Sequence, residues 1–125
     1  MTQITVADVK RVTEEILAEY GEDYVYPEAL RTTRCIYADP ISGVPSCIVG
    51  HIASRLDPEL FEVMQAWDRR STPHPPTSPW VAFSERGLPT RFVSEIFEAQ
   101  AAQDMGKPWG KAAEFILNFS DEIPA

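Results

Sequence analysis

The chain has 125 residues, of which 44% are hydrophobic and 24% are charged, and its formal net charge is −8. This length and this balance predict one globular domain with a modest core, spanning residues 1–125. The acidic excess argues against direct nucleic-acid binding, because contacts to phosphates need a surplus of Lys and Arg.

The sequence also argues against a membrane protein. No apolar run approaches the roughly 18 residues that a membrane span requires. The first ten residues, MTQITVADVK, are polar and mixed in charge, unlike a signal peptide. We therefore expect a cytoplasmic protein.

The first predicted element is an amphipathic helix over residues 5–20. Thr5 is a favourable N-cap, and Asp8 can complete a capping box with it. Apolar side chains then recur at three- and four-residue steps and form one stripe: Val9, Val12, Ile16, Leu17 and Tyr20. Gly21 is a natural end for the helix.

A small antiparallel β-ribbon is predicted after this helix. The stretches YVY (24–26) and RCIY (34–37) are aromatic and β-branched, which is typical of strands. The stretch DPISG (39–43) is typical of a tight turn, with Asp39 at its start and Gly43 at its exit.

The central segment predicts two consecutive helices. Ser46 can cap a largely apolar helix over residues 47–56, and Asp57 can cap the next helix with Pro58 at its permitted first position. Gly50 costs about 1 kcal/mol relative to Ala inside a helix. It is therefore expected where another stretch of backbone passes close to the helix.

The last third of the chain alternates between loops and helices. STPHPPTSP (71–79) is rich in proline and predicts an extended surface loop. WVAF (80–83) predicts a short strand. A helix is expected from Thr90 to Gly106 and another after Pro108, followed by a frayed tail over residues 120–125.

These elements together predict the α+β class. The expected architecture is a helix-rich single domain in which about five helices pack with the small antiparallel β-ribbon. No internal repeat is evident.

Two cysteines and two histidines are the candidate metal ligands: Cys35, Cys47, His51 and His74. Together they would supply a Cys2His2 set for zinc, but the cysteines lie too far apart for the usual zinc signatures. Cys47 and His51 share one helix face, whereas a thiol nucleophile usually takes its base from another element. We favour buried, space-filling cysteines and a His51 bonded to a backbone carbonyl, with no catalytic residue, metal or cofactor.

An acidic stretch is the first candidate contact surface. It contains six acidic residues and no basic one: Glu14, Glu15, Glu19, Glu22, Asp23 and Glu28. Such a stretch is commonly only a solvated surface, and alternatively it is a docking patch or a mimic of the nucleic-acid backbone. His74 and Trp80, in and beside the proline-rich loop, are further candidates for contact with a partner.

Two stretches resemble a family of small uncharacterised proteins of actinobacteria and their bacteriophages. The first runs from YVY through GVPSCIVG and combines these residues: Tyr24, Val25, Tyr26, Cys35, Tyr37, Gly43, Pro45, Ser46, Cys47, Ile48, Val49 and Gly50. The second is AQDMGKPWGKA, with these: Ala102, Gln103, Asp104, Gly106, Trp109, Gly110 and Ala112. The resemblance implies a phage- or prophage-like protein in the host cytoplasm. It carries no established activity.

The leading functional prediction is an acidic, non-enzymatic phage accessory protein that binds a host or phage protein, with charge favouring a basic one. One alternative is a zinc-binding or thiol-dependent protein that uses Cys35, Cys47 and His51. Another is a DNA-mimic inhibitor of a nucleic-acid-binding protein. The sequence leaves the partner and the oligomeric state open.

Overall fold

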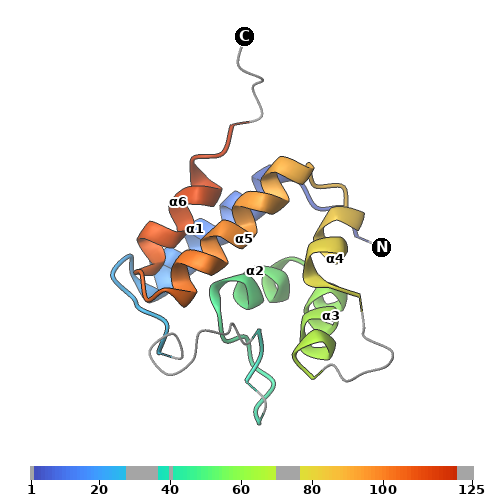
Figure 1. The fold of residues 1–125 in the computed structure, drawn as a ribbon, viewed down its shortest axis with the longest axis horizontal. Helices are drawn as coiled ribbons and strands as arrows, with labels where there is room; N and C mark the ends of the chain where they lie inside the picture. Colours follow the sequence, from blue (N-terminus) through green and yellow to red (C-terminus); the bar gives the residue numbers. More distant parts are fainter. Residues whose placement is uncertain (1, 28–36, 40, 70–76, 121–125) are drawn as a thin grey trace.

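A computed structural model describes residues 2–27, 37–39, 41–69 and 77–120 of the chain. These residues contain six α-helices (Figure 1): α1 (Val6–Tyr20), α2 (Ile48–Leu56), α3 (Pro58–Asp68), α4 (Pro79–Glu85), α5 (Thr90–Asp104) and α6 (Trp109–Leu117). None of these helices has the length and apolarity needed to cross a membrane.

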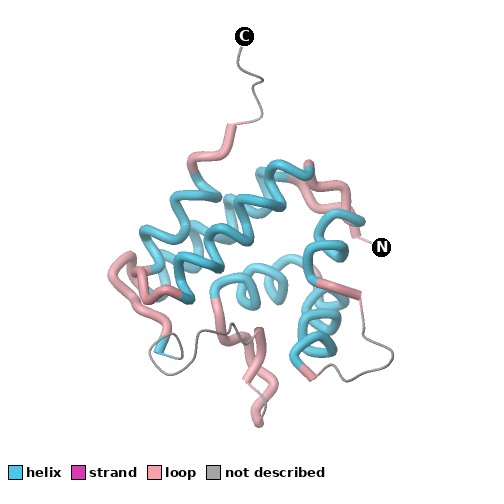
Figure 2. Tube along the Cα trace, in the orientation of Figure 1, coloured by secondary structure: helices cyan, strands magenta, loops and turns pink. Residues whose placement is uncertain are grey.

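The predicted α+β class is wrong, because the described residues form helices and loops without a strand (Figure 2). A turn follows Asp39, whose carboxylate accepts hydrogen bonds from the backbone N–H groups of Ile41 and Ser42, while Pro40 of the DPISG stretch lies outside the described residues. In the part of the chain that the structure describes, the two sides of this turn pair at an isolated antiparallel bridge between Ala38 and Pro45. Pro45 has no N–H to continue a ladder, and α2 begins three residues later.

The YVY stretch is a loop rather than a strand because its backbone partner is a helix terminus. The carbonyl oxygen of Tyr24 accepts a hydrogen bond from the N–H of Trp109 at 2.7 Å. The carbonyl oxygen of Glu22 accepts one from the N–H of Gly110 at 2.8 Å. These bonds satisfy N–H groups that the first turn of α6 cannot satisfy internally. Of the RCIY stretch, residues 34–36 lie outside the described residues.

The WVAF stretch belongs to α4, not to a strand. The side chain of Ser78 caps the helix by accepting a hydrogen bond from the N–H of Val81, and Pro79 occupies the first helical position. These two start signals outweigh the β propensity of the aromatic and branched residues. The 71–79 loop was predicted to end at Pro79, which instead begins the helix; residues 70–76 lie outside the described part.

The other helix predictions are confirmed. Thr5 and Asp8 form the capping box of α1. Asp57 caps α3 by accepting a hydrogen bond from Glu59 N–H, with Pro58 at the first position. Cys47, rather than Ser46, occupies the N-cap position of α2, without a side-chain cap bond.

The core lies between α1, α2, α5 and α6 and extends to the inner faces of α3 and α4. Figure 1 shows α1, α5 and α6 side by side, with α2 against them and α3 and α4 toward one end. Most of its large side chains are aliphatic or aromatic and fully buried, among them these: Ile16, Ile48, Ile52, Leu60, Phe83, Phe92, Ile96, Trp109 and Ile116. Their burial supplies the main favourable free energy of folding.

Candidate protein-interaction surface

Five of the six acidic candidates form an exposed surface on the last turns of α1 and the turn that follows. We call this the acidic surface, and it consists of these residues: Glu14, Glu15, Glu19, Glu22 and Asp23. Glu28 lies outside the described residues. Glu15 and Glu19 lie one turn apart on the same face of α1, Glu14 lies beside Glu15 on the helix, and Glu22 and Asp23 lie in the turn that follows.

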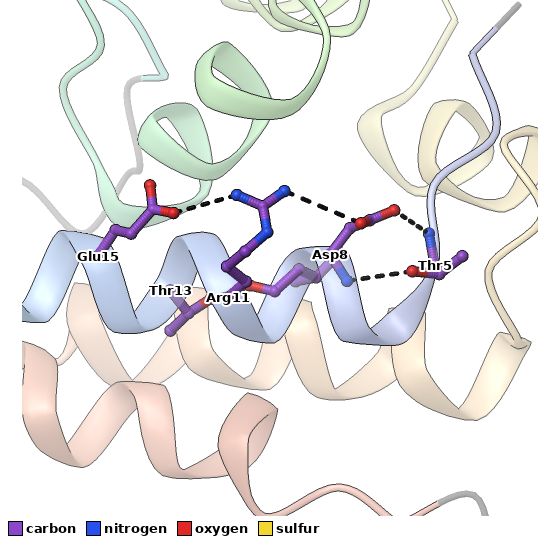
Figure 3. A network of polar contacts seen from close by, with 6 residues as sticks. Thr5, Asp8, Arg11, Thr13 and Glu15 are labelled. Atoms are coloured by element: carbon purple, nitrogen blue, oxygen red, sulfur yellow. Dashed lines mark hydrogen bonds and ion pairs between the residues drawn. The ribbon is translucent and has the colours of Figure 1, made fainter.

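Basic neighbours neutralise only part of the acidic surface. Arg11 reaches Glu15 at 3.1 Å and Asp8 at 3.9 Å (Figure 3). Arg55 from α2 forms an ion pair with Glu19, and this hydrogen bond and charge lower the pKa of the Glu19 carboxyl. Among the described residues, the other three members of the acidic surface make no ion pair: Glu14, Glu22 and Asp23. The acidic surface therefore keeps a net negative charge.

The end of α1 is held against α6 by a contact that requires glycine. A Cβ added to Gly110 would lie 2.8 Å from the Cβ of Glu22 and 2.9 Å from its carbonyl oxygen. The same carbonyl accepts the hydrogen bond from Gly110 N–H. Gly21, at φ 95°, lets the chain leave α1 and reach this position. Glycines at these two places therefore let the turn that carries Glu22 and Asp23 pack closely against the start of α6.

A cluster of four aromatic rings connects the end of α1 to α2 and α6. Trp109 is fully buried, and its ring lies 4.6 Å from that of Tyr24 and 5.2 Å from that of Tyr20, measured between centroids. His51 meets the edges of Tyr20 at 5.0 Å and Trp109 at 5.6 Å. These edge-to-face contacts join α1, α2 and α6.

His51 is a packing residue of this cluster. Its side chain is 8% exposed, and the bond to a backbone carbonyl predicted from the sequence is not among the hydrogen bonds of the described residues. Burial lowers the pKa of His51 to about 4, with the Arg55 charge acting in the same direction and that of Glu19 opposing it. The imidazole is therefore neutral at pH 7.

This burial predicts a pH-dependent loss of stability. Because the folded-state pKa of His51 lies below its ordinary value of 6.5, the unfolded chain takes up a proton first as the pH falls. The free energy of unfolding should decrease between about pH 6.5 and pH 4, by on the order of 2 kcal/mol in total. Urea unfolding at pH values half a unit apart measures this decrease in the free energy of unfolding.

A His51→Gln variant is the control for this pH dependence. The raised pKa of Asp104, caused by burial, stabilises the fold as the pH falls and opposes the effect of His51. This contribution remains in both proteins, so the difference between the two profiles isolates His51. Parallel profiles from pH 7 to pH 4 would contradict the assignment.

Cys47 is placed as the space-filling interpretation predicts. Its side chain is completely buried at the start of α2 and belongs to the hydrophobic core. Within the described part of the chain, no three His, Cys, Asp or Glu side chains are grouped so that they could hold a metal ion. Cys35 and His74 lie outside that part, so the complete Cys2His2 set is not placed.

Gln103 has a structural role that the sequence did not indicate. Its side chain is fully buried, and its Oε1 accepts hydrogen bonds from the N–H of Ile48 at 2.8 Å and from Nε1 of Trp109 at 3.1 Å. The two stretches that carry the family resemblance therefore meet at this side chain. The signal in the sequence is a polar residue at an inward-facing position of the helix, four residues after Ala99 and seven after Ile96.

Trp80 does not join the acidic surface. It lies on α4, which packs against α3 and α5, whereas α1 packs against α2 and α6. The side chain is 39% exposed, and its ring lies 5.7 Å from that of Phe97 between centroids. Trp80 is therefore accessible to a partner, and a role in binding one stays a prediction.

Comparison with known proteins adds no relative: no family model, curated protein or solved structure matches the chain. The family resemblance therefore stays a prediction. The structure nevertheless gives physical roles to four of the residues that carry it. Gln103 bonds α2 and Trp109, Trp109 fills the aromatic cluster, and Gly50 and Gly110 allow close backbone contacts.

Proposed function

We propose that the protein is a non-enzymatic accessory protein that binds a basic segment of a host or phage protein through the acidic surface. The observation that carries this proposal is the set of exposed carboxylates without an ion-pair partner in the described residues: Glu14, Glu22 and Asp23. The family resemblance supports a phage or prophage origin and action in the host cytoplasm.

The geometry supports binding because the acidic surface is exposed but its base is rigid. The capping box begins α1, Gly21 ends it, and hydrogen bonds from the start of α6 fix the following turn. A backbone that is already held in place loses little conformational entropy when a cationic partner binds the side chains it carries. Negative potential at such a surface also accelerates encounter with a positively charged partner.

The test compares two charge-reversal variants in quantitative affinity capture from an actinobacterial host lysate. Glu14→Lys/Asp23→Lys alters the acidic surface, and Glu62→Lys/Glu85→Lys changes the net charge equally at exposed positions on α3 and α4. The proposal expects a protein that the wild type and the α3–α4 variant retain and the acidic-surface variant loses. Equal capture by all three proteins, or capture by none, contradicts it.

A competition step separates simple protein binding from mimicry of DNA. If the retained protein is released by duplex DNA at moderate salt, it uses its nucleic-acid site to bind the acidic surface. If DNA does not release it, the acidic surface recognises a different basic segment. The first result supports a DNA-mimic inhibitor, and the second supports the accessory role proposed above.

A further inference from the structure

We draw no further inference here: the strongest candidate, the hollow between α5 and α6 that exposes Met105 and Phe115, carries none because acidic and basic side chains line it together and nothing in the structure shows what covers it.

Discussion

A Gly50→Ala substitution is expected to destabilise the fold by about 3 kcal/mol, even though alanine is the better helix former by about 1 kcal/mol. A Cβ built on Gly50 would lie 2.1 Å from the carbonyl oxygen of Tyr37 and 3.0 Å from its carbonyl carbon. The clash is with backbone, so rotation of a side chain cannot relieve it.

The backbone at Tyr37 is also fixed by its own hydrogen bonds. Its carbonyl oxygen accepts one from Ser46 N–H at 2.9 Å, and the carboxylate of Asp68 accepts from the N–H groups of Tyr37 and Ala38 at 3.0 and 3.1 Å. Moving the segment away from α2 would break these bonds. The substitution therefore costs either steric strain or hydrogen bonds.

Urea denaturation measures the effect of Gly50→Ala, with Ser54→Ala as the matched control in the same helix. Ser54 is half-buried, and its replacement should change the free energy of unfolding by no more than about 0.5 kcal/mol. Gly110→Ala should fall between the two, since its nearest contacts are longer. A Gly50→Ala protein as stable as the wild type would show that the backbone contact is easily displaced.

Sequence patterns predicted the helices well where local chemistry determines them. The Thr5 capping box and the Asp57–Pro58 helix start are local signals, and both are present in the structure. Gly50 also predicted a close backbone contact, which is confirmed. The sequence did not indicate that the contacting backbone would be that of Tyr37, because the contact joins two separate segments.

The errors arose where tertiary contacts outweigh β propensity. Tyr24 reads as a strand residue, but its carbonyl accepts a hydrogen bond from Trp109 N–H at the start of α6. No local rule indicates that a loop will be used to cap a distant helix. The polar link from Gln103 to Ile48 is equally non-local, since it depends on how α5 and α2 approach one another.

The candidate surfaces were predicted in part, for a related reason. Acidic residues that cluster in the sequence also cluster in space when they lie on one helix and its adjoining turn, so the acidic surface could be located. How this surface is held against α6 could not be predicted, because the hydrogen bonds from Trp109 N–H and Gly110 N–H to the turn after α1 join distant segments of the chain.

Replacing Arg86 with leucine is expected to cost about 3–5 kcal/mol of stability, because it leaves a buried carboxylate without its countercharge. Arg86 Nε donates to Asp57 Oδ2 at 2.9 Å, and its Nη1 donates to the carbonyl oxygen of Ala82 at 2.8 Å. The side chains of the ion pair are 4% and 3% exposed. Asp57 also caps α3 through Glu59 N–H, so the pair joins α3 to the end of α4.

Arg11→Leu is the control for Arg86→Leu, measured by the same urea denaturation. Arg11 also forms an ion pair, but its side chain is 60% exposed, so its loss should cost less than about 1 kcal/mol. The contrast tests burial rather than the mere presence of an ion pair. Equal losses for the two arginines would contradict the prediction.

The pH dependence of the Arg86→Leu variant identifies the cause of its instability. In the wild type, burial raises the pKa of Asp57, but hydrogen bonds from Arg86 and Glu59 N–H and the Arg86 charge outweigh it and leave the pKa lowered. Without Arg86, burial should raise the folded-state pKa of Asp57 above its unfolded value. Protonation then favours folding, so the difference from the wild type should shrink as the pH falls.

An Arg86→Leu/Asp57→Ser double variant completes the argument. Serine can still cap α3, and it removes the buried charge that Arg86→Leu alone would leave unpaired. The double variant should therefore be more stable than Arg86→Leu at pH 7, and its difference from the wild type should vary less with pH. If the double variant is instead less stable than either single variant, the lost stability arises from packing around the arginine rather than from an uncompensated carboxylate.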